Sequence, residues 1–231
     1  AGRDRGGRPA PAPRVGGPIT AAAGVRVAPP SGNTSGRPSP TNMADMLEDM
    51  DGKIDGIVDG GPCAVGVEST IIDLTCTPPR LLRPGGITLE QLREVLGEVA
   101  VDPAVTRLMG EGEKPRAPGM KYRHYAPKAP VTVVQGAPAA AARYIQDHMA
   151  PGDGVICFDE YAGLFDGHPL EQLGPSTDVP EQARRVFDAL RWFDGTDVQQ
   201  IWAQCPEAAG IGLAVANRLN KAAGFHIVQA E

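Results

Sequence analysis

Hydroxyl and amide side chains gather in the stretch SGNTSGRPSP at residues 31–40. The polar donors of this stretch are Ser31, Asn33, Thr34, Ser35 and Ser39. A loop of this kind in front of a helix suits an anion such as phosphate, because its donors point at the anion without adding bulk. Loops rich in serine, glycine and proline are more often ordinary turns, so both interpretations stay open at this point.

Two more groups of polar residues follow in segments that otherwise resemble strands. Glu68, Ser69 and Thr70 interrupt the stretch VGVESTIID, where a strand should keep at least one face apolar. These side chains therefore either lie on an exposed edge or line a cleft. Arg83 follows the two leucines of RLLRPGG. A guanidinium at a strand end can bind phosphate through two parallel hydrogen bonds, although a surface ion pair is the alternative.

Residues 117–127, APGMKYRHYAP, hold two cations, a histidine and two tyrosines side by side. Five consecutive large polar or aromatic residues fit neither a helix face nor a buried strand, since they leave no apolar side to bury. We therefore expect an exposed loop that contacts a ligand or partner. His124 in this loop could act as a base or donate to phosphate, although a lone histidine is more often structural.

Other chemical signals in the sequence are weak. Four scattered cysteines form no CxxC pair and lack histidines at metal-ligand spacing, which favours reduced core thiols over a disulfide framework or a zinc site. GIGLAVANR at 210–218 holds two glycines of a dinucleotide motif but no acidic ribose ligand follows it, so helix capping is the better interpretation. The sequence offers no nucleophilic triad with a local signature.

Composition favours a folded chain without a membrane span. The 231 residues are 42% hydrophobic, enough for one large domain or two small ones. No apolar run approaches the roughly 20 residues of a transmembrane helix, and no signal segment opens the chain, so we expect a cytoplasmic protein. Residues 114–128 hold five cations and no acid. A basic run interleaved with aromatic residues more often meets phosphate or nucleic acid than a plain charged face does.

Several short elements must position the polar residues before position 100. Residues 1–23 are mostly glycine, proline, alanine and arginine, which predicts disorder. Short strands are predicted at 24–29, 55–61, 65–75 and 79–86. A helix over 42–50 is expected to be capped by Thr41, and a helix over 89–96 to carry a capping box of Thr88 and Gln91 and to end at Gly97. Residues 101–130 lack periodicity, which is typical of a linker or a functional lid.

The pattern changes after residue 130, where strands and helices alternate. Strands are predicted at 131–134, 154–158, 199–203 and 225–228, and helices at 138–148, 180–193 and 211–222. Such alternation predicts a small parallel sheet with helices on its faces. The fold class is therefore α/β.

Four motifs, taken in order, resemble one known family. APPSGNTSGRPSPT, DGKIDGIVDGGPCAVGVESTIIDLT, RLLRPGGIT and APGMKYRHYAP resemble the Sua5 branch of the YrdC/Sua5 family, the L-threonylcarbamoyladenylate synthases. The resemblance implies the C-terminal part of a YrdC-like α/β domain at 24–100, a linker and active-site lid at 101–130, and a small Rossmann-like Sua5 domain at 131–231. It also implies that L-threonine, bicarbonate and ATP, with Mg²⁺, form threonylcarbamoyl-AMP for the t6A modification of tRNA.

The resemblance further implies roles for individual residues. Ser31, Asn33, Ser39, Arg83, His124 and Tyr125 fall on nucleotide-binding positions. Pro29 and Ser69 fall on threonine-binding positions, and Pro29 stands where the family usually has a small residue. Since the carbamate and the α-phosphate are both anionic, positioning and charge neutralisation should do most of the work, with Arg83 and Mg²⁺ offsetting the repulsion. No residue is implied as a catalytic group or as a metal ligand.

The sequence also departs from the family at its N-terminus. The family has a longer N-terminal part with a Lys-x-Arg-Pro element that binds the nucleotide, and GGRPAPAP at 6–13 lacks that lysine. We therefore expect a truncated chain with half a YrdC-like domain. Two functions stay open: the family reaction, weakened by the missing part, or a non-catalytic module whose Sua5 domain binds tRNA or a tRNA-modification partner protein.

Overall fold

The computed structural model describes residues 16–24, 32–110, 112, 115–117 and 124–231. The predicted strand at 24–29 and most of the predicted disordered segment lie outside these residues. Helix α1 (Gly16–Ala23) is the described part of that segment, so the expectation of disorder is wrong there. The segment ITAAA within this helix ends in three alanines, and alanine is the strongest helix former.

Three short strands form the sheet of the first half of the chain, which we call the N-terminal unit (residues 32–110). Strand β1 (Ile71–Asp73) pairs antiparallel with β2 (Arg80–Arg83), which pairs parallel with β3 (Ala100–Val101). Helix α3 (Leu89–Leu96) packs on this sheet, where Leu89 joins Leu81 and Val99 in a small core. The predicted capping box of Thr88 and Gln91 and the stop at Gly97 are confirmed.

Helix α2 (Met43–Met50) shows that the predicted cap was wrong by one residue. Asn42 has an extended backbone and its side chain accepts a hydrogen bond from the backbone N–H of Asp45 at 3.0 Å. Thr41 lies outside the helix, and its hydroxyl donates to Asp188 instead. Both residue types favour the cap position, so the sequence alone could not distinguish between them.

Two predicted strands of the N-terminal unit are absent or shortened. Residues 55–61 form no strand: Val58 is 68% exposed, and the Asp59 side chain accepts from the Gly61 N–H in a local turn. The strand expected at 65–75 is reduced to β1, because residues 65–70 leave the sheet as a loop. The segment after α3 is not structureless, since it contains β3 and a 3₁₀ turn at Pro103–Val105.

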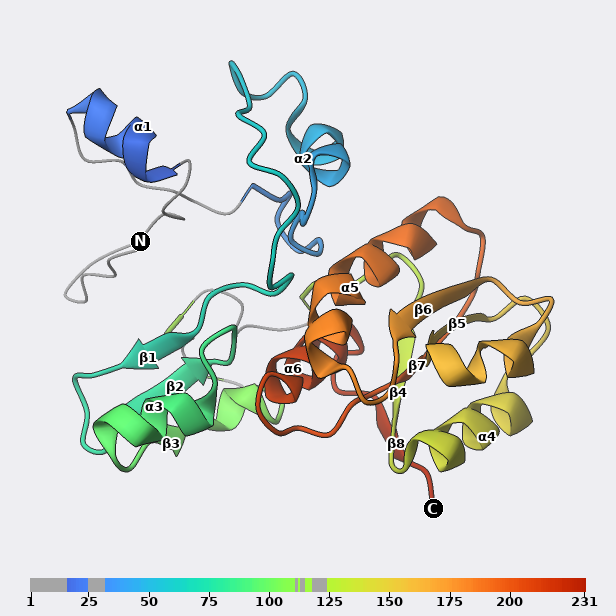
Figure 1. Ribbon diagram of the computed structural model, residues 1–231. Coiled ribbons are helices and arrows are strands. Elements are labelled where there is room, and N and C mark those ends of the chain that lie inside the picture. The colour runs from blue at the N-terminus through green and yellow to red at the C-terminus, as the bar shows by residue number, and fades with distance from the viewer. Residues whose placement is uncertain (1–15, 25–31, 111, 113–114, 118–123) are drawn as a thin grey trace.

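Residues 124–231 form what we call the C-terminal unit, built on a five-stranded sheet (Figure 1). Its strand order is β6-β5-β7-β4-β8 and every neighbouring pair is parallel, as predicted. The strands are β4 (Val131–Gln135), β5 (Gly154–Phe158), β6 (Leu170–Gly174), β7 (Ile201–Gln204) and β8 (Ile227–Gln229). Strand β6 was not predicted, because its LEQLG sequence places two polar residues in an edge strand.

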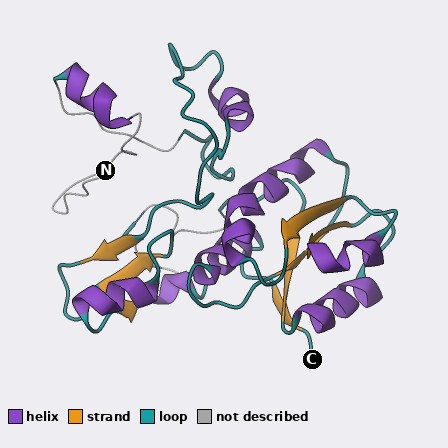
Figure 2. Cartoon of the chain, viewed as in Figure 1, coloured by secondary structure: helices purple, strands orange, loops and turns teal. Residues whose placement is uncertain are grey.

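Helices cover both faces of this sheet (Figure 2). They are α4 (Pro138–His148), α5 (Val179–Trp192) and α6 (Gly212–Ala222), close to their predicted bounds. Successive strand residues point to opposite faces. Accordingly, Ile156 belongs to the core beneath α5 and α6, whereas Val155 belongs to the core beneath α4. The α/β fold class is therefore confirmed.

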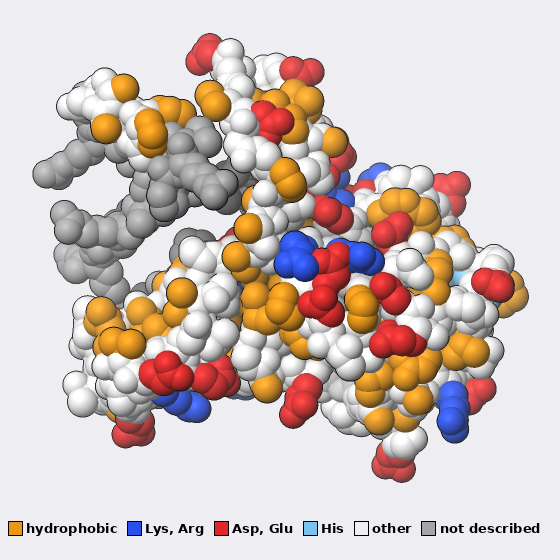
Figure 3. Space-filling view, viewed as in Figure 1, with side chains coloured by type: hydrophobic (Ala, Val, Ile, Leu, Met, Phe, Trp, Pro, Cys, Tyr) orange, Lys and Arg blue, Asp and Glu red, His pale blue; other side chains and the backbone are white. Residues whose placement is uncertain are grey.

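The surface carries charge of both signs. On the face seen in Figure 3, acidic side chains are spread over both units and basic side chains lie beside some of them. Within the described part of the chain, no helix is both long and apolar enough to cross a membrane.

Candidate functional site

The loop at residues 65–70 holds Glu68 where the two units meet. A Cβ on Gly66 would lie 2.3 Å from the Ala183 backbone oxygen of α5, and Gly66 has a φ of +81°. A Cβ on Gly85 would lie 2.3 Å from the backbone oxygen of Glu68. Only glycine allows these two close approaches, so the backbone around Glu68 is fixed from both sides.

Glu68 accepts hydrogen bonds from both units. Its Oε1 accepts from Ser39 Oγ at 2.7 Å, and its Oε2 accepts from Nε of Arg218 in α6 at 2.7 Å. Burial alone would raise the pKa of Glu68, but the charges of Arg218 and Arg83 and the hydrogen bond from Ser39 outweigh it and lower that pKa. Glu68 is therefore a carboxylate at neutral pH.

Ser69 and Arg83, two residues predicted to bind ligands, lie in direct contact. Arg83 ends β2, and its Nε donates to the Ser69 backbone oxygen at 3.0 Å while its NH2 donates to Ser69 Oγ at 3.2 Å. The antiparallel pairing of β1 with β2 brings them together, because Ile71 at the start of β1 is opposite Arg83. Burial lowers the pKa of Arg83, and the charge of Glu68 acts in the opposite direction.

Tyr125 and His124 pack beside this pair. Tyr125 is 1% exposed, and its ring lies 5.5 Å from the guanidinium carbon of Arg218. The expectation of an exposed loop is therefore wrong for Tyr125, which packs on Phe187 of α5. Residues 118–123 of the same motif lie outside the described residues.

His124 is held in a surrounding that disfavours its charged form. Its backbone N–H donates to the Lys221 backbone oxygen at 3.2 Å, and its ring lies edge-on to Tyr125 at 4.2 Å. Burial lowers the pKa of His124, and the charges of Lys221, Arg218 and Arg83 lower it further against the opposing effect of Glu68. The imidazole is therefore neutral at pH 7, and its buried Nδ1 has no partner among the described residues.

The other predicted site residues are placed differently. Ser31 and Pro29 lie outside the described residues. Asn33 shapes its own loop, because its Nδ2 donates to the backbone oxygens of Arg37 at 3.1 Å and Thr34 at 3.2 Å. Of the described part of this loop, it is Ser39 that reaches Glu68.

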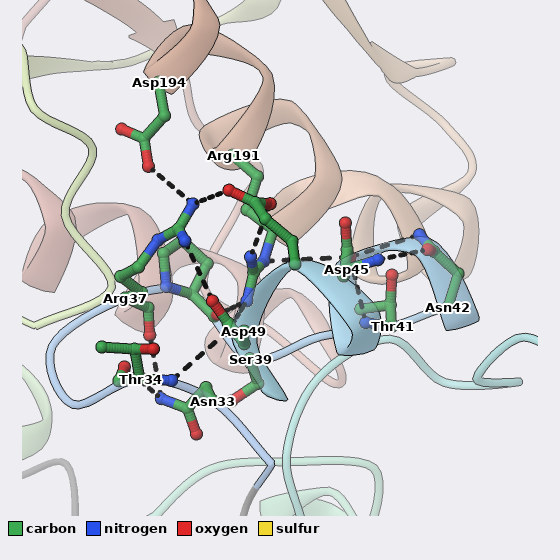
Figure 4. A network of polar contacts seen from close by, with 12 residues as sticks. Asn33, Thr34, Arg37, Ser39, Thr41, Asn42, Asp45, Asp49, Arg191 and Asp194 are labelled. Atoms are coloured by element: carbon green, nitrogen blue, oxygen red, sulfur yellow. Dashed lines mark hydrogen bonds and ion pairs between the residues drawn. The ribbon is translucent and has the colours of Figure 1, made fainter. Parts of the chain in front are cut away.

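A network of ion pairs fixes the loop that carries Ser39 against α5 (Figure 4). Arg191 of α5 donates to the Pro38 backbone oxygen at 2.6 Å and forms an ion pair with Asp49 of α2. Arg37 donates to the other oxygen of Asp49 at 2.9 Å and also pairs with Asp194 at 3.2 Å. Ser39 is thereby held by the C-terminal unit as well as by its own loop.

Sequence reasoning assigned no role to two residues at the centre of the site. Glu68 stood out only as part of a polar triplet. Arg218 lies within GIGLAVANR, where a cation falls among the buried Val215 and Leu219 of an apolar helix face. A charge at such a position is rarely buried without a partner, and this is the signal that could have identified it.

The charges and donors of the site would suit an oxyanion. Two guanidinium groups, Arg83 and Arg218, flank a single carboxylate, and Lys221 lies nearby on α6 with a pKa lowered to about 8 by burial and by the charge of Arg218. Guanidinium groups bind phosphate and carboxylate oxygens with two donors at once. The hydroxyls of Ser39 and Ser69 add neutral polar contacts.

Comparisons with known families and proteins find relatives of both units. A family model described as the C-terminal domain of threonylcarbamoyl-AMP synthase matches residues 87–224, and the Sua5/YrdC model, described as telomere recombination, matches residues 7–85. The chain is 43% identical to threonylcarbamoyl-AMP synthase of Bacillus subtilis, covering 89% of this chain and 59% of that protein. It is 46% identical to the enzyme of the same name from Pyrococcus abyssi, with coverage of 88% and 59%.

A solved structure gives the same result for the fold. The crystal structure of P. abyssi Sua5 complexed with L-threonine superposes with a TM-score of 0.78 at 44% identity, covering 87% of this chain and 59% of that one. The chain thus spans about three fifths of the length of the relatives it matches. Because the matches run through both units, the chain belongs to the Sua5 branch of the YrdC/Sua5 family, the threonylcarbamoyl-AMP synthases.

Proposed function

We propose that this chain forms threonylcarbamoyl-AMP from L-threonine, bicarbonate and ATP with release of pyrophosphate. The observation that carries the proposal is the convergence of Ser39, Ser69 and Arg83 around Glu68, with Tyr125 packed against the same group. These residues come from the four separate motifs that share one family pattern. The relatives named threonylcarbamoyl-AMP synthase support the proposal, since they match most of this chain.

The geometry suits a reaction between two anions. Threonine carbamate must approach the α-phosphate of ATP, and cations at the meeting point lower the repulsion between them. We assign this role to Arg83, and the contacts by which Ser69 holds its guanidinium at the end of β2 support the assignment. Neutral His124 can donate or accept one hydrogen bond without adding charge.

The described site fits phosphate oxygens better than it fits a metal ion. Guanidinium groups dominate it, and the Glu68 carboxylate is already engaged by Ser39 and Arg218. Mg²⁺ would therefore be bound mainly through the triphosphate, where it would neutralise developing charge. The product would serve the t6A modification of tRNA, so tRNA and tRNA-modification proteins are the proposed downstream partners.

A direct assay tests the proposed function. The chain is incubated with labelled L-threonine, bicarbonate and Mg-ATP, and pyrophosphate and labelled threonylcarbamoyl-AMP are quantified, with the B. subtilis relative run in parallel to validate the assay. We expect pyrophosphate release that requires both threonine and bicarbonate. Release by the relative with none from this chain would overturn the proposal.

A further inference from the structure

Arg218 lies in the C-terminal unit but contacts the acidic centre of the N-terminal unit. It is fully buried in α6, and its Nε forms the 2.7 Å ion pair with Glu68. Asn217 Oδ1 accepts from its NH1 at 2.9 Å, and the Tyr125 ring lies beside the guanidinium. The group is thus held on several sides and has little freedom to move.

This burial costs stability and therefore indicates another role. The NH2 atom of Arg218 is buried and has no partner among the described residues. An unsatisfied buried donor carries a desolvation penalty, and a buried ion pair is often no more stabilising than apolar residues of the same size. Packing alone would favour an apolar side chain at this position of α6.

Arg218 acts on Ser39 through Glu68, whose carboxylate accepts hydrogen bonds from both residues. An ionised carboxylate only accepts hydrogen bonds, so the Ser39 hydroxyl must donate its hydrogen to Glu68 across the 2.7 Å contact. The lone pairs of Ser39 Oγ then remain available to a ligand. If Glu68 were protonated, it could donate a hydrogen bond to Ser39 Oγ instead. The Ser39 hydroxyl would then be free to donate its own hydrogen to the ligand. Arg83 also lowers the pKa of Glu68 through its charge, but its Nε and NH2 donate to Ser69, whereas Arg218 donates directly to the carboxylate and has the larger effect on that pKa.

We propose that Arg218 is a positioning residue of this site: by holding the Glu68 carboxylate, it fixes the Ser39 hydroxyl as a hydrogen-bond acceptor toward a donor group of the substrate, such as a hydroxyl, and not toward its anionic oxygens. The proposal rests on the proposed function, because that function supplies the substrate that Ser39 meets. It assigns to α6 of the C-terminal unit a direct part in the site.

The first test needs no substrate. The pKa of Glu68 is measured by carbon-detected NMR in the chain, in Arg218→Met and in Arg218→Lys. Loss of the positive charge should raise the pKa in Arg218→Met, whereas Arg218→Lys should keep most of the wild-type value. Arg185→Met is the control, because it removes another arginine of the C-terminal unit, one that pairs with Glu181 and Asp159 and contacts neither Glu68 nor the loop that carries Ser39. An unchanged pKa in Arg218→Met would overturn the proposal.

The second test separates positioning from folding. In the pyrophosphate assay, Arg218→Met should lower kcat/KM by about 10²-fold, the scale of a misplaced contact, and shift the acid limb of the pH profile upward. Arg218→Lys should recover much of this loss. In a Ser39→Ala background the Arg218→Met effect should shrink, since both changes act on one contact. Additive effects of the two changes would contradict positioning through Ser39.

The two tests also distinguish this inference from the proposed function. A wild-type chain that makes no product, yet shows the expected pKa change in Arg218→Met, would refute the function and leave the link between Arg218 and Glu68 intact. An active chain in which Arg218→Met retains full activity with a wild-type pH profile would refute the inference alone.

Discussion

Individual residues at the site differ in how visible they are in the sequence. Ser69 and Arg83 stand out as polar groups beside apolar strand residues, but this pattern leaves an exposed edge or a surface ion pair open, and only the family resemblance implies that they bind ligands. Their contact depends on β1 pairing with β2. Arg218 could not be predicted to join them, since its partner Glu68 lies 150 positions earlier and no local periodicity links the two.

Arg83 offers a prediction with a control on the same strand. Arg83→Met should lower kcat/KM for pyrophosphate release by about 10²- to 10³-fold, the typical loss when one preorganised donor to a developing anion is removed. Arg80→Met is the control, because Arg80 shares β2 but pairs at 3.7 Å with Asp102, away from Glu68. Equal losses in the two variants, measured by steady-state kinetics, would contradict the role given to Arg83.

His124 predicts a specific pH dependence of stability. Its pKa is lowered in the folded chain by burial and by Lys221, Arg218 and Arg83, against Glu68, so the unfolded chain binds its proton first as the pH falls. Stability contributed by neutral His124 is therefore present above pH 6.5, its ordinary pKa, and is lost as the pH falls below it. His124→Gln should flatten this part of the curve of unfolding free energy against pH, measured by urea titration. A variant curve parallel to the wild type below pH 6.5 would refute the assignment.

At the scale of elements, periodicity predicted the C-terminal unit better than the N-terminal one. The strands and helices after residue 130 alternate regularly, and α4 and β5 begin and end where predicted. In the N-terminal unit, the strand predicted at 55–61 depended on only two apolar residues, Ile57 and Val58, among glycines and aspartates, and these residues form no strand. The loop at 65–70 packs against α5 and does not continue the sheet. This is a tertiary contact that the local sequence does not encode.

Two glycines with similar φ angles allow the cost of a strained backbone to be measured separately from the cost of displacing the 65–70 loop from α5. Gly61 has a φ of +85° with open space around its Cβ position, whereas Gly66 has a φ of +81° and would place a Cβ 2.3 Å from α5 backbone. Gly61→Ala should cost about 1 kcal/mol of unfolding free energy, the cost of left-handed backbone for an L-residue. Gly66→Ala should cost roughly 2 kcal/mol more, because the backbone of α5 or of the loop must move. Equal costs in urea denaturation would show that the loop does not dock as described.

Across the whole molecule, the two units are joined by polar contacts as well as by packing. Arg218 pairs with Glu68, Arg191 and Arg37 pair with Asp49, and Asn217 Nδ2 donates to the Val105 backbone oxygen at 2.7 Å. The contacts of Arg218, Arg191 and Asn217 each join residues more than 100 positions apart in the sequence. The contact of Arg37 with Asp49 lies within one unit. Hydrogen bonds and ion pairs depend on the direction and charge of their groups. They therefore fix the orientation of one unit relative to the other more strictly than apolar packing alone does.

A substitution at Asp49 tests whether these ion pairs couple the unfolding of the two units, because Asp49 pairs with both Arg191 and Arg37. Burial alone would raise its pKa, but Arg191, the Thr34 N–H and Arg37 outweigh burial and lower the pKa of Asp49 below its ordinary 3.8. Asp49→Asn leaves buried Arg191 without this carboxylate partner, and breaking a buried ion pair typically costs about 3–5 kcal/mol. Glu48→Gln is the control, since Glu48 also pairs with Arg37 but its side chain is 55% exposed, and exposed pairs contribute about 0–1 kcal/mol.

The expected result for Asp49→Asn is a loss of coupling as well as of stability. Followed by the fluorescence of Trp192 and Trp202, both in the C-terminal unit, and by helical circular dichroism of both units, wild type and Glu48→Gln should unfold in one transition, and Asp49→Asn in two. The stability that ionised Asp49 provides should also be lost as the pH falls from 3.8 through the lower folded-state pKa, a step that Asp49→Asn should remove. A single transition with wild-type midpoint in Asp49→Asn would mean that the ion pair of Asp49 with Arg191 does not couple the units, which would then be held by their apolar contacts and by the other polar contacts between them.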